Sequence, residues 1–282
     1  MYEEITAQIR LEAERKNLRE STIKAYCRNV EYFLRTVNKE IPDLSTDDVD
    51  AFLTEKRLGG LGPQTYNHYY SSIRFFYKRI LKQNWDEEDI PRMKLDHSLP
   101  TVLSREEIQS IIDHTKNLKH KAIIATMYSS GLRVSEVAHL HYEDISRANH
   151  TIHIRDSKNR WDRYTILSDR NLALLTEYWF KCGRPTGILF PSSWTGTYLS
   201  IDGINQFFKK SAAAAGISRH VTCHACRHSF ASHLFEDGVD IKYIQALLGH
   251  VDPKSTEVYI HVSNKSLLGI HSPFDLPKGG RS

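Results

Sequence analysis

The chain has few cysteines and no long apolar run, and these two shortages narrow the class of protein. Only 4 of its 282 residues are cysteine, too few for a disulfide framework, so we expect a reducing compartment. No apolar run approaches the roughly 18 residues that a membrane span needs. The first segment, MYEEITAQIRLEAERKNLRE, is charged throughout and does not look like a signal peptide. The sequence therefore predicts a cytoplasmic protein that contacts no membrane.

A large excess of one sign of charge is also missing. The formal net charge is +4. Residues 1–97 hold 16 Lys and Arg against 17 Asp and Glu, whereas residues 98–282 hold 22 against 17. The basic surplus lies in the second part of the chain, where it permits a polyanionic partner without requiring one.

Apolar residues repeat at helical spacing through the first third of the chain, and the capping signals divide it into helices. We expect one helix capped by Ser21, a second that starts at Ser45, and a third that opens on Gly62-Pro63. The aromatic residues of the third helix share one face, which is more typical of a core than of a base-stacking surface. The chain length also favours two domains.

The helical pattern stops between residues 84 and 101, where two prolines and a charge cluster replace it. Such a stretch is typical of an interdomain connection. We therefore predict a helical domain over residues 1–97, a linker over 98–103, and a second domain over 104–282.

The second domain combines helices with a short hairpin. Ser104 and Glu107 form a capping box, and the run KAIIATMYSSGLRVSEVAHL is helix-like. TIHIRDSKNRWDRYTIL contains two β-prone runs around a polar middle. Helices return in the last third, with Gly238 and Gly249 as expected stops. The predicted fold class is mainly α with a small antiparallel β-sheet.

The stretch TCHACRHSFASHL raises the question of a metal or redox site at Cys223 and Cys226. A structural zinc site needs a second pair of ligands, and the chain has no other closely spaced cysteines. A redox motif would follow a strand in a βαβ unit, which is not visible here. We expect the two sulfurs to act as small, half-buried apolar groups at a helix start, with no metal site.

An anion site explains the same stretch better. His224 and Arg227 lie three residues apart, so on a helix both can point at one phosphate. The planar guanidinium of arginine suits that task because it donates two parallel hydrogen bonds. A lone pair of this kind is usually an ordinary surface pair. Arg133, however, also stands among apolar residues, where it either reaches out to solvent or faces a buried anion.

Taken in order along the chain, these pieces resemble the tyrosine site-specific recombinases and phage-type integrases, most of all their Xer-type members. The resemblance rests on Gly-Leu-Arg133-x-x-Glu136, Lys158 in the hairpin, His224-x-x-Arg227-His-Ser-Phe-Ala-x-His, Leu-Leu-Gly-His250 and Tyr259. It runs from about Ser104 to about Val262. Residues 1–97 also look like the helical, SAM-like core-binding domain of that family. Cys226 departs from the family pattern, which usually has leucine there.

The resemblance implies that the protein cleaves and rejoins DNA. Tyr259 would be the nucleophile that forms a 3′-phosphotyrosyl intermediate. Arg133 and Arg227 would clamp the non-bridging oxygens of the scissile phosphate, and Lys158 would protonate the leaving 5′-oxygen.

Four further residues complete the implied site. His224 would assist proton transfer at the tyrosine, and His250 would hydrogen-bond the phosphate. Glu136 and His261 would contact these groups and hold them in position, without touching the phosphate. The resemblance implies that the reaction needs no metal, no ATP and no other cofactor.

The implied partner is double-stranded DNA at core sites, bound by four protomers on two sites. The C-terminal segment, residues 263–282, would be exchanged with a neighbouring protomer, or would pack within its own chain. Seven basic residues are candidate DNA contacts: Lys56, Arg57, Arg74, Lys78, Lys209, Lys210 and Arg219.

Three other functions stay open at this point. A type IB topoisomerase-like enzyme would use the same tyrosine chemistry as a monomer without site preference. A catalytically idle DNA-binding protein would keep the basic surface but need not keep all six catalytic groups. A metal-dependent nuclease could use some of the 15 histidines. Within the recombinases, integration, excision, inversion and dimer resolution all fit the sequence.

Overall fold

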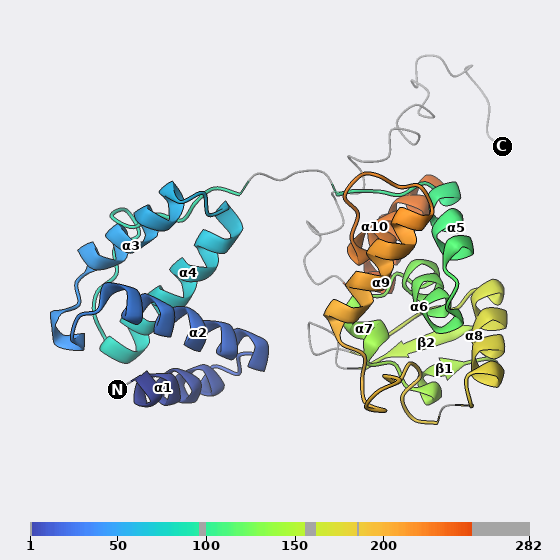
Figure 1. Ribbon diagram of the computed structural model, residues 1–282, viewed down its shortest axis with the longest axis horizontal. Coiled ribbons are helices and arrows are strands. Elements are labelled where there is room, and N and C mark those ends of the chain that lie inside the picture. Colours follow the sequence, from blue (N-terminus) through green and yellow to red (C-terminus); the bar gives the residue numbers. More distant parts are fainter. Residues whose placement is uncertain (1, 96–99, 156–161, 185, 250–282) are drawn as a thin grey trace, which may run out of the picture. The chain divides into compact units, whose positions relative to one another are not determined.

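The computed structural model describes residues 2–95, 100–155, 162–184 and 186–249. These residues form two compact units, one within Met1–His97 and the other within Ser98–Ser282 (Figure 1). Each unit has a hydrophobic core of its own. No helix in the described part of the chain is both long and apolar enough to cross a membrane.

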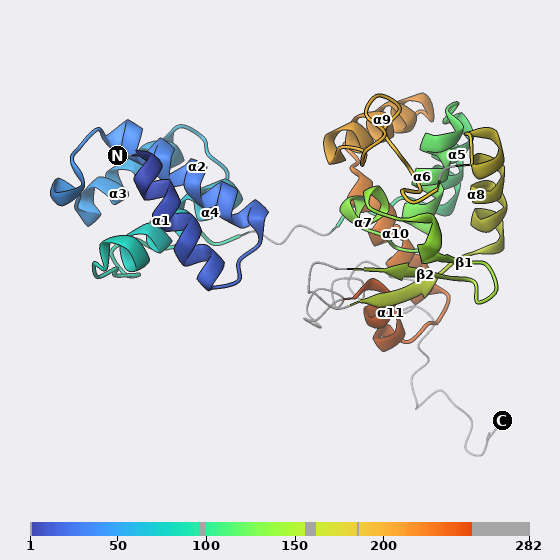
Figure 2. The ribbon, with the colours of Figure 1, turned by 90° about the horizontal axis from the view of Figure 1, so that it is seen from below.

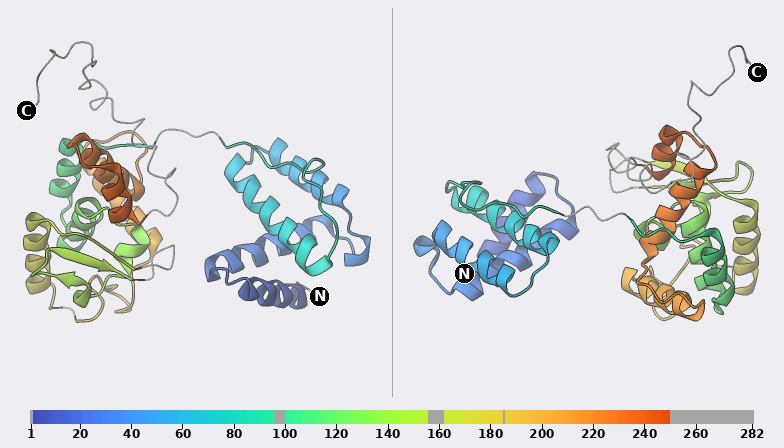
Figure 3. Two further views of the ribbon diagram at one scale, coloured as in Figure 1. Left: turned by 180° about the vertical axis from the view of Figure 1, so that it is seen from behind. Right: turned by 90° about the horizontal axis from the view of Figure 1, so that it is seen from above.

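The first unit is all helical, and its core is rich in aromatic side chains. Its elements are α1 (Tyr2–Arg15), α2 (Glu20–Val37), η1 (Ile41–Asp43), α3 (Thr46–Leu58), α4 (Pro63–Phe75) and the π-helical turn η2 (Phe76–Leu81). Helix α2 packs against both α1 and α4 (Figure 3). Phe33 and Phe52 meet edge to face with ring centroids 5.2 Å apart, an arrangement that aromatic pairs favour.

Two of the three predicted helix starts in this unit are confirmed. The Ser45 hydroxyl accepts a hydrogen bond from the Asp48 backbone N–H, and the Asp48 carboxylate accepts one from the Ser45 N–H at 3.0 Å. Helix α4 begins at Pro63, as expected. The prediction of Ser21 as a cap is wrong, because α2 already begins at Glu20, whose acidic side chain suits the positive end of a helix.

Residues in and next to the aperiodic stretch belong to the cores of the two units. Trp85 and Ile90, which fall in the aperiodic stretch, are buried in the core of the first unit, and the Trp85 indole N–H donates to the Tyr70 hydroxyl at 3.1 Å. Leu103, the last residue of the predicted linker, is fully buried in the second core. Its backbone N–H donates to the Ser229 hydroxyl at 2.8 Å. Single apolar residues that pack without a repeat leave no periodicity to detect.

The second unit surrounds a small sheet with helices, which confirms the predicted fold class. Its helices are α5 (Arg105–His114), α6 (Leu118–Ser129), α7 (Val134–Ala138), η3 (Tyr142–Asp144), α8 (Asp169–Lys181), α9 (Ile201–Ala214), α10 (Cys223–Glu236) and α11 (Ile241–Leu248). Its strands are β1 (Ile145–Ser146), β2 (Thr151–Ile154) and β3 (Arg163–Ile166). The sheet is antiparallel in the order β1-β2-β3, so β2 and β3 form the predicted hairpin. Helix α11 lies against β3 (Figure 2).

The helix-like run predicted before Leu140 is broken by a tight turn between α6 and α7. Gly131 in that turn has φ +64°, a conformation that side chains with a Cβ rarely adopt. A Cβ on Gly131 would also lie 2.5 Å from Cδ1 of Phe230. The turn therefore lets α6 pack against α10. It also places Arg133 and Glu136, at the start of α7, close to α10.

Candidate active site

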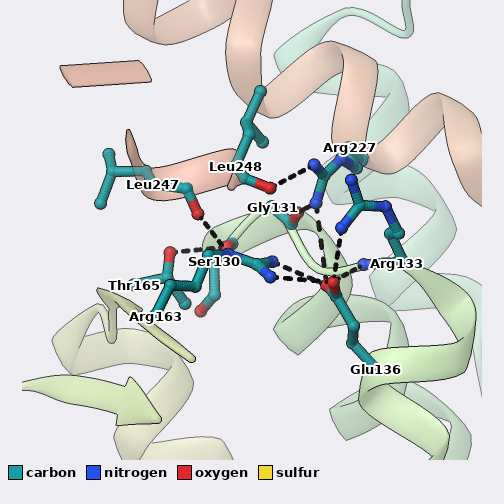
Figure 4. Close-up of polar contacts among 9 residues, drawn as sticks. All are labelled: Ser130, Gly131, Arg133, Glu136, Arg163, Thr165, Arg227, Leu247 and Leu248. Carbon is teal, nitrogen blue, oxygen red and sulfur yellow. Dashed lines mark hydrogen bonds and ion pairs between the residues drawn. The ribbon is translucent and has the colours of Figure 1, made fainter. Parts of the chain in front are cut away.

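The centre of the site is the carboxylate of Glu136, on which three arginines converge (Figure 4). Arg133 donates to it twice, from its backbone N–H to Oε2 at 2.8 Å and from Nη1 to Oε1 at 2.7 Å. Arg163 on β3 donates as a fork, with Nη1 2.9 Å from Oε1 and Nη2 2.7 Å from Oε2. The Glu136 side chain is only 6% exposed, so these contacts replace its hydration.

Arg227 approaches the same carboxylate from α10. Its Nη1 lies 3.7 Å from Oε2 of Glu136 and donates to the Gly131 carbonyl at 2.7 Å. Its Nη2 donates to the Leu248 carbonyl at the end of α11, at 2.5 Å. Arg227 is 1% exposed and therefore joins the α6–α7 turn, the start of α7 and the end of α11 from inside the domain.

The arginines keep Glu136 ionised although it is buried. Burial by itself would raise the pKa of this carboxyl, but the hydrogen bonds and charge of Arg163, the Arg133 backbone N–H and the charge of Arg227 lower it to about 2. Three guanidinium groups then face one carboxylate. The positive surplus in a place of low dielectric suits an oxyanion such as phosphate.

Solvent reaches the three arginines unequally. The side chain of Arg133 is 16% exposed, against 8% for Arg163 and 2% for Arg227. Arg133 is thus the best placed of the three to meet a ligand that arrives from outside, whereas the other two are set deeper.

His224 lies one helical turn before Arg227 on α10 and is exposed. Its ring meets the ring of His228 edge to face, with centroids 4.6 Å apart. Burial, together with the charges of His224 and Arg227, lowers the pKa of His228 to about 4. His228 is therefore neutral near pH 7, and it can act there as a hydrogen-bonding group but not as a cation.

The structure brings together three of the predicted site residues, Arg133, Glu136 and Arg227, and places His224 on the helix that carries Arg227. The other predicted residues lie outside the described part of the chain: Lys158, His250, Tyr259 and His261. The C-terminal segment predicted to be exchanged, residues 263–282, also lies outside it.

Arg163 also belongs to this cluster, although the sequence motifs do not mark it. Its strand alternates buried and exposed positions, and Arg163 occupies a buried position in the same face as Thr165. An arginine in the inward register of a strand is uncommon unless it is paired. That alternation is the signal that could have identified it.

The seven candidate DNA contacts divide into two groups. Four are exposed and form no ion pair with another described residue: Arg57, Lys78, Lys209 and Lys210. Three have partners within their own unit: Lys56 donates to the Tyr32 hydroxyl, Arg74 pairs with Glu87, and Arg219 pairs with Glu107. The first group keeps its charge available to a polyanion, whereas the second shares it with a neighbour.

Cys223 and Cys226 are buried in the core of the second unit, at 3% and 0% exposure. They are more deeply buried than the sequence suggested, because the start of α10 packs inward against that core. Burial raises the pKa of the Cys223 thiol to about 12. Both thiols therefore act as apolar groups. Among the described residues, no group of His, Cys, Asp and Glu side chains could hold a metal ion.

Comparison with known proteins identifies the family. Residues 101–266 match the phage integrase family, and residues 5–87 match the phage integrase N-terminal SAM-like domain. The chain belongs to the phage integrase family.

Relatives along nearly the whole chain agree with this assignment. The putative integrase/recombinase y4qK of Sinorhizobium fredii is 33% identical over 93% of this chain and 85% of its own length. The tyrosine recombinase XerD of Caulobacter vibrioides is 31% identical over 89% of this chain and 88% of its own, which confirms the resemblance to Xer-type members. A lambda integrase tetramer bound to a Holliday junction shares the fold, with a TM-score of 0.74 at 16% identity over 91% of this chain and 76% of that one.

Proposed function

We propose that this protein is a site-specific DNA recombinase that breaks and rejoins DNA through a 3′-phosphotyrosyl intermediate on Tyr259. The observation that carries the proposal is the convergence of Arg133 and Arg227 on one buried carboxylate, in a chain of the phage integrase family. Integration, excision, inversion and dimer resolution all use this chemistry.

A tyrosine nucleophile suits a reaction that must be reversible. The phosphotyrosyl ester stores the energy of the broken phosphodiester, so rejoining requires no ATP. The difficulty is the negative charge that accumulates on the five-coordinate phosphorus. Preorganised hydrogen-bond donors directed at such charge supply the largest single share of its stabilisation. Arg133 and Arg227 supply these donors, because Glu136 fixes their direction.

Three further groups would complete the cycle. Lys158 protonates the departing 5′-oxygen, His224 assists proton transfer at the tyrosine, and His250 hydrogen-bonds the phosphate. Glu136 and His261 support them. Because side chains neutralise the phosphate, the reaction proceeds without a metal ion or another cofactor.

The DNA partner follows from the same proposal. Residues 1–97 act as a core-binding domain and residues 104–282 as the catalytic domain, joined through residues 98–103. Four protomers assemble on two core sites and exchange their C-terminal segments, residues 263–282. The lambda integrase relative forms a tetramer on a Holliday junction, which supports this assembly. The protein acts in the cytoplasm.

The deciding experiment traps and sequences the DNA that becomes covalently attached to the purified chain. Genomic fragments are incubated with the protein, the reaction is stopped with detergent, and the adducts are digested for sequencing and peptide mapping. We expect one preferred site, a 3′-phosphate linked to Tyr259, and equal yields with or without a chelator and ATP.

Each alternative gives a different outcome in this experiment or in a plasmid-relaxation assay run beside it. Loss of activity in the chelator would indicate a metal-dependent nuclease and contradict the proposal. Relaxation of any supercoiled plasmid by the monomer, without a preferred site, would favour a type IB topoisomerase-like enzyme. DNA binding without any adduct would indicate an idle DNA-binding protein.

A further inference from the structure

Arg163 joins three segments that are far apart in the sequence. It stands at the start of β3 and is buried. Its guanidinium fork holds both oxygens of Glu136, at the start of the domain's α7. Its Nε–H donates to the Leu247 carbonyl in the last turn of α11, at 2.9 Å. One side chain thus fixes β3, α7 and α11 with respect to one another.

Stability alone is a poor explanation for this arrangement. Buried ion pairs are often no more stable than apolar side chains of the same volume, because both charges lose their hydration. What the planar fork of arginine adds is direction. It sets the plane of the Glu136 carboxylate, and that plane decides where Arg133 and Arg227 can point.

The end of α11 is located in the same way by two arginines in succession. Arg163 binds the Leu247 carbonyl and Arg227 binds the Leu248 carbonyl. Gly249 follows with φ +63°, and a Cβ at that position would lie 2.8 Å from Cδ of Arg163. The backbone therefore passes close to Arg163 immediately before residue 250, and Tyr259 follows ten residues after Gly249.

We propose that Arg163 is a positioning residue for DNA strand cleavage. It orients Glu136 toward Arg133 and Arg227, and it fixes the point from which the chain continues to His250 and Tyr259. This inference rests on the proposed recombinase function and adds to it a residue that never touches the DNA.

The test compares Arg163→Lys and Arg163→Gln with the unmodified full chain. Arg163→Lys keeps the charge but loses the fork, so it separates direction from electrostatics. Arg170→Gln is the matched control, because Arg170 lies in the same unit and, within the described part of the chain, donates to Gln109 at the surface. The substrate is the duplex recovered in the trapping experiment, and the readouts are the single-turnover rate of adduct formation and the DNA dissociation constant.

We expect Arg163→Lys to slow adduct formation on the order of 10²-fold, as small displacements of reacting groups do. The DNA affinity of Arg163→Lys should equal that of the unmodified chain. The adduct-formation rate of Arg170→Gln should also equal that of the unmodified chain. A cleavage rate in Arg163→Lys equal to that of the unmodified chain would overturn the inference. So would a rate loss that merely parallels a loss of folded, DNA-binding protein.

The pH profile gives a second readout that a purely structural role would not change. The charged groups that face Glu136 are Arg133, Arg163 and Arg227. Burial raises the pKa of Glu136, and Arg163 opposes this effect with its hydrogen bonds and its charge. Without Arg163, the pKa of Glu136 therefore rises. The rate of Arg163→Gln should then fall more steeply than the rate of the unmodified chain as the pH drops through the mildly acidic range.

An Arg163→Gln profile that runs parallel to the profile of the unmodified chain would count against the inference. If the unmodified chain forms no adduct at all, the proposed function fails, and this inference fails with it. If the unmodified chain reacts and both Arg163 variants react as fast as it does, only this inference fails.

Discussion

At the scale of single residues, the site depends on one buried carboxylate that holds several cations in place. Glu136 receives hydrogen bonds from Arg133 and Arg163 and lies 3.7 Å from Arg227. An unpaired charge in this position would be strongly unfavourable. Glu136 and the arginines therefore act as a unit, in which each member keeps the others ionised and oriented.

Replacing Glu136 by Gln should destabilise the second unit in a pH-dependent way. The pKa of Glu136 lies at about 2 in the folded chain and near 4.5 when unperturbed. The stability linked to this shift is fully present above 4.5 and disappears as the pH falls toward 2. At neutral pH the loss should be on the order of 3 kcal/mol.

Urea unfolding of both proteins at a series of pH values measures this difference. The gap in unfolding free energy should narrow through the acidic range. Glu177→Gln, which removes an exposed partner of Lys181, serves as the control and should change little. A gap that stays constant from neutral to acidic pH would contradict the assignment of the shift to Glu136.

The sequence predicted part of the site because family motifs mark some residues and not others. Arg133, Glu136 and Arg227 stand in motifs with fixed spacing, and the structure brings them together. Arg163 stands in a short strand, where its role depends on a register and on an α11 carbonyl more than eighty positions away. Only the folded chain shows such a contact.

At the scale of elements, the turn between α6 and α7 decides where the site forms. Gly131 adopts φ +64° and packs under the ring of Phe230, while its carbonyl accepts a hydrogen bond from Arg227. The turn must be tight enough for α10 to approach and open enough for Arg227 to reach it. Glycine satisfies both conditions.

Gly131→Ala should destabilise the second unit by about 2–4 kcal/mol, from the unfavourable φ together with the clash with Phe230. Gly183→Ala is a matched control, because Gly183 has φ +84° and nothing lies within 4 Å of a Cβ there. Its free energy of unfolding should fall by about 1–2 kcal/mol, because only the unfavourable φ angle acts there. Chemical unfolding of both variants checks the difference. Equal losses would show that the packing under Phe230 does not matter.

Helices with a periodic apolar pattern or a local capping signal could be predicted from the sequence. Packing between residues that are distant in the sequence could not. The capping boxes at Ser45 and Ser104 fixed the starts of α3 and α5 correctly, because a cap is a local hydrogen bond. The burial of Trp85 and Leu103 depends on partners that are distant in the sequence. An aperiodic stretch therefore looked like a linker although parts of it belong to the two cores.

At the scale of the whole molecule, the chain consists of two units with separate cores and a modest basic surplus. Only some of the basic side chains keep their charge available. Lys209 and Lys210 on α9 are exposed, as are Arg57 and Lys78 in the first unit. DNA affinity that comes from such contacts should fall steeply with salt, because each phosphate contact releases counterions.

Lys209→Ala and Lys78→Ala should each reduce the slope of log affinity against log salt concentration by about 0.9, if each side chain neutralises one phosphate. Fluorescence anisotropy with the recovered duplex at several salt concentrations measures the slope. Lys181→Ala is the control, because Lys181 is exposed but pairs with Glu177, and its slope should equal that of the unmodified chain. An unchanged slope in a lysine variant would remove that residue from the DNA contacts.

The central claim is that an aromatic hydroxyl carries the broken DNA strand, and Tyr259→Phe tests it most directly. This change removes one oxygen, so DNA binding should persist while no covalent adduct forms on a nicked duplex from which the cleaved end diffuses away. Denaturing gels report the adduct, and anisotropy reports the binding. Full loss of the adduct at unchanged affinity is the expected result, and an adduct that survives in Tyr259→Phe would contradict the account.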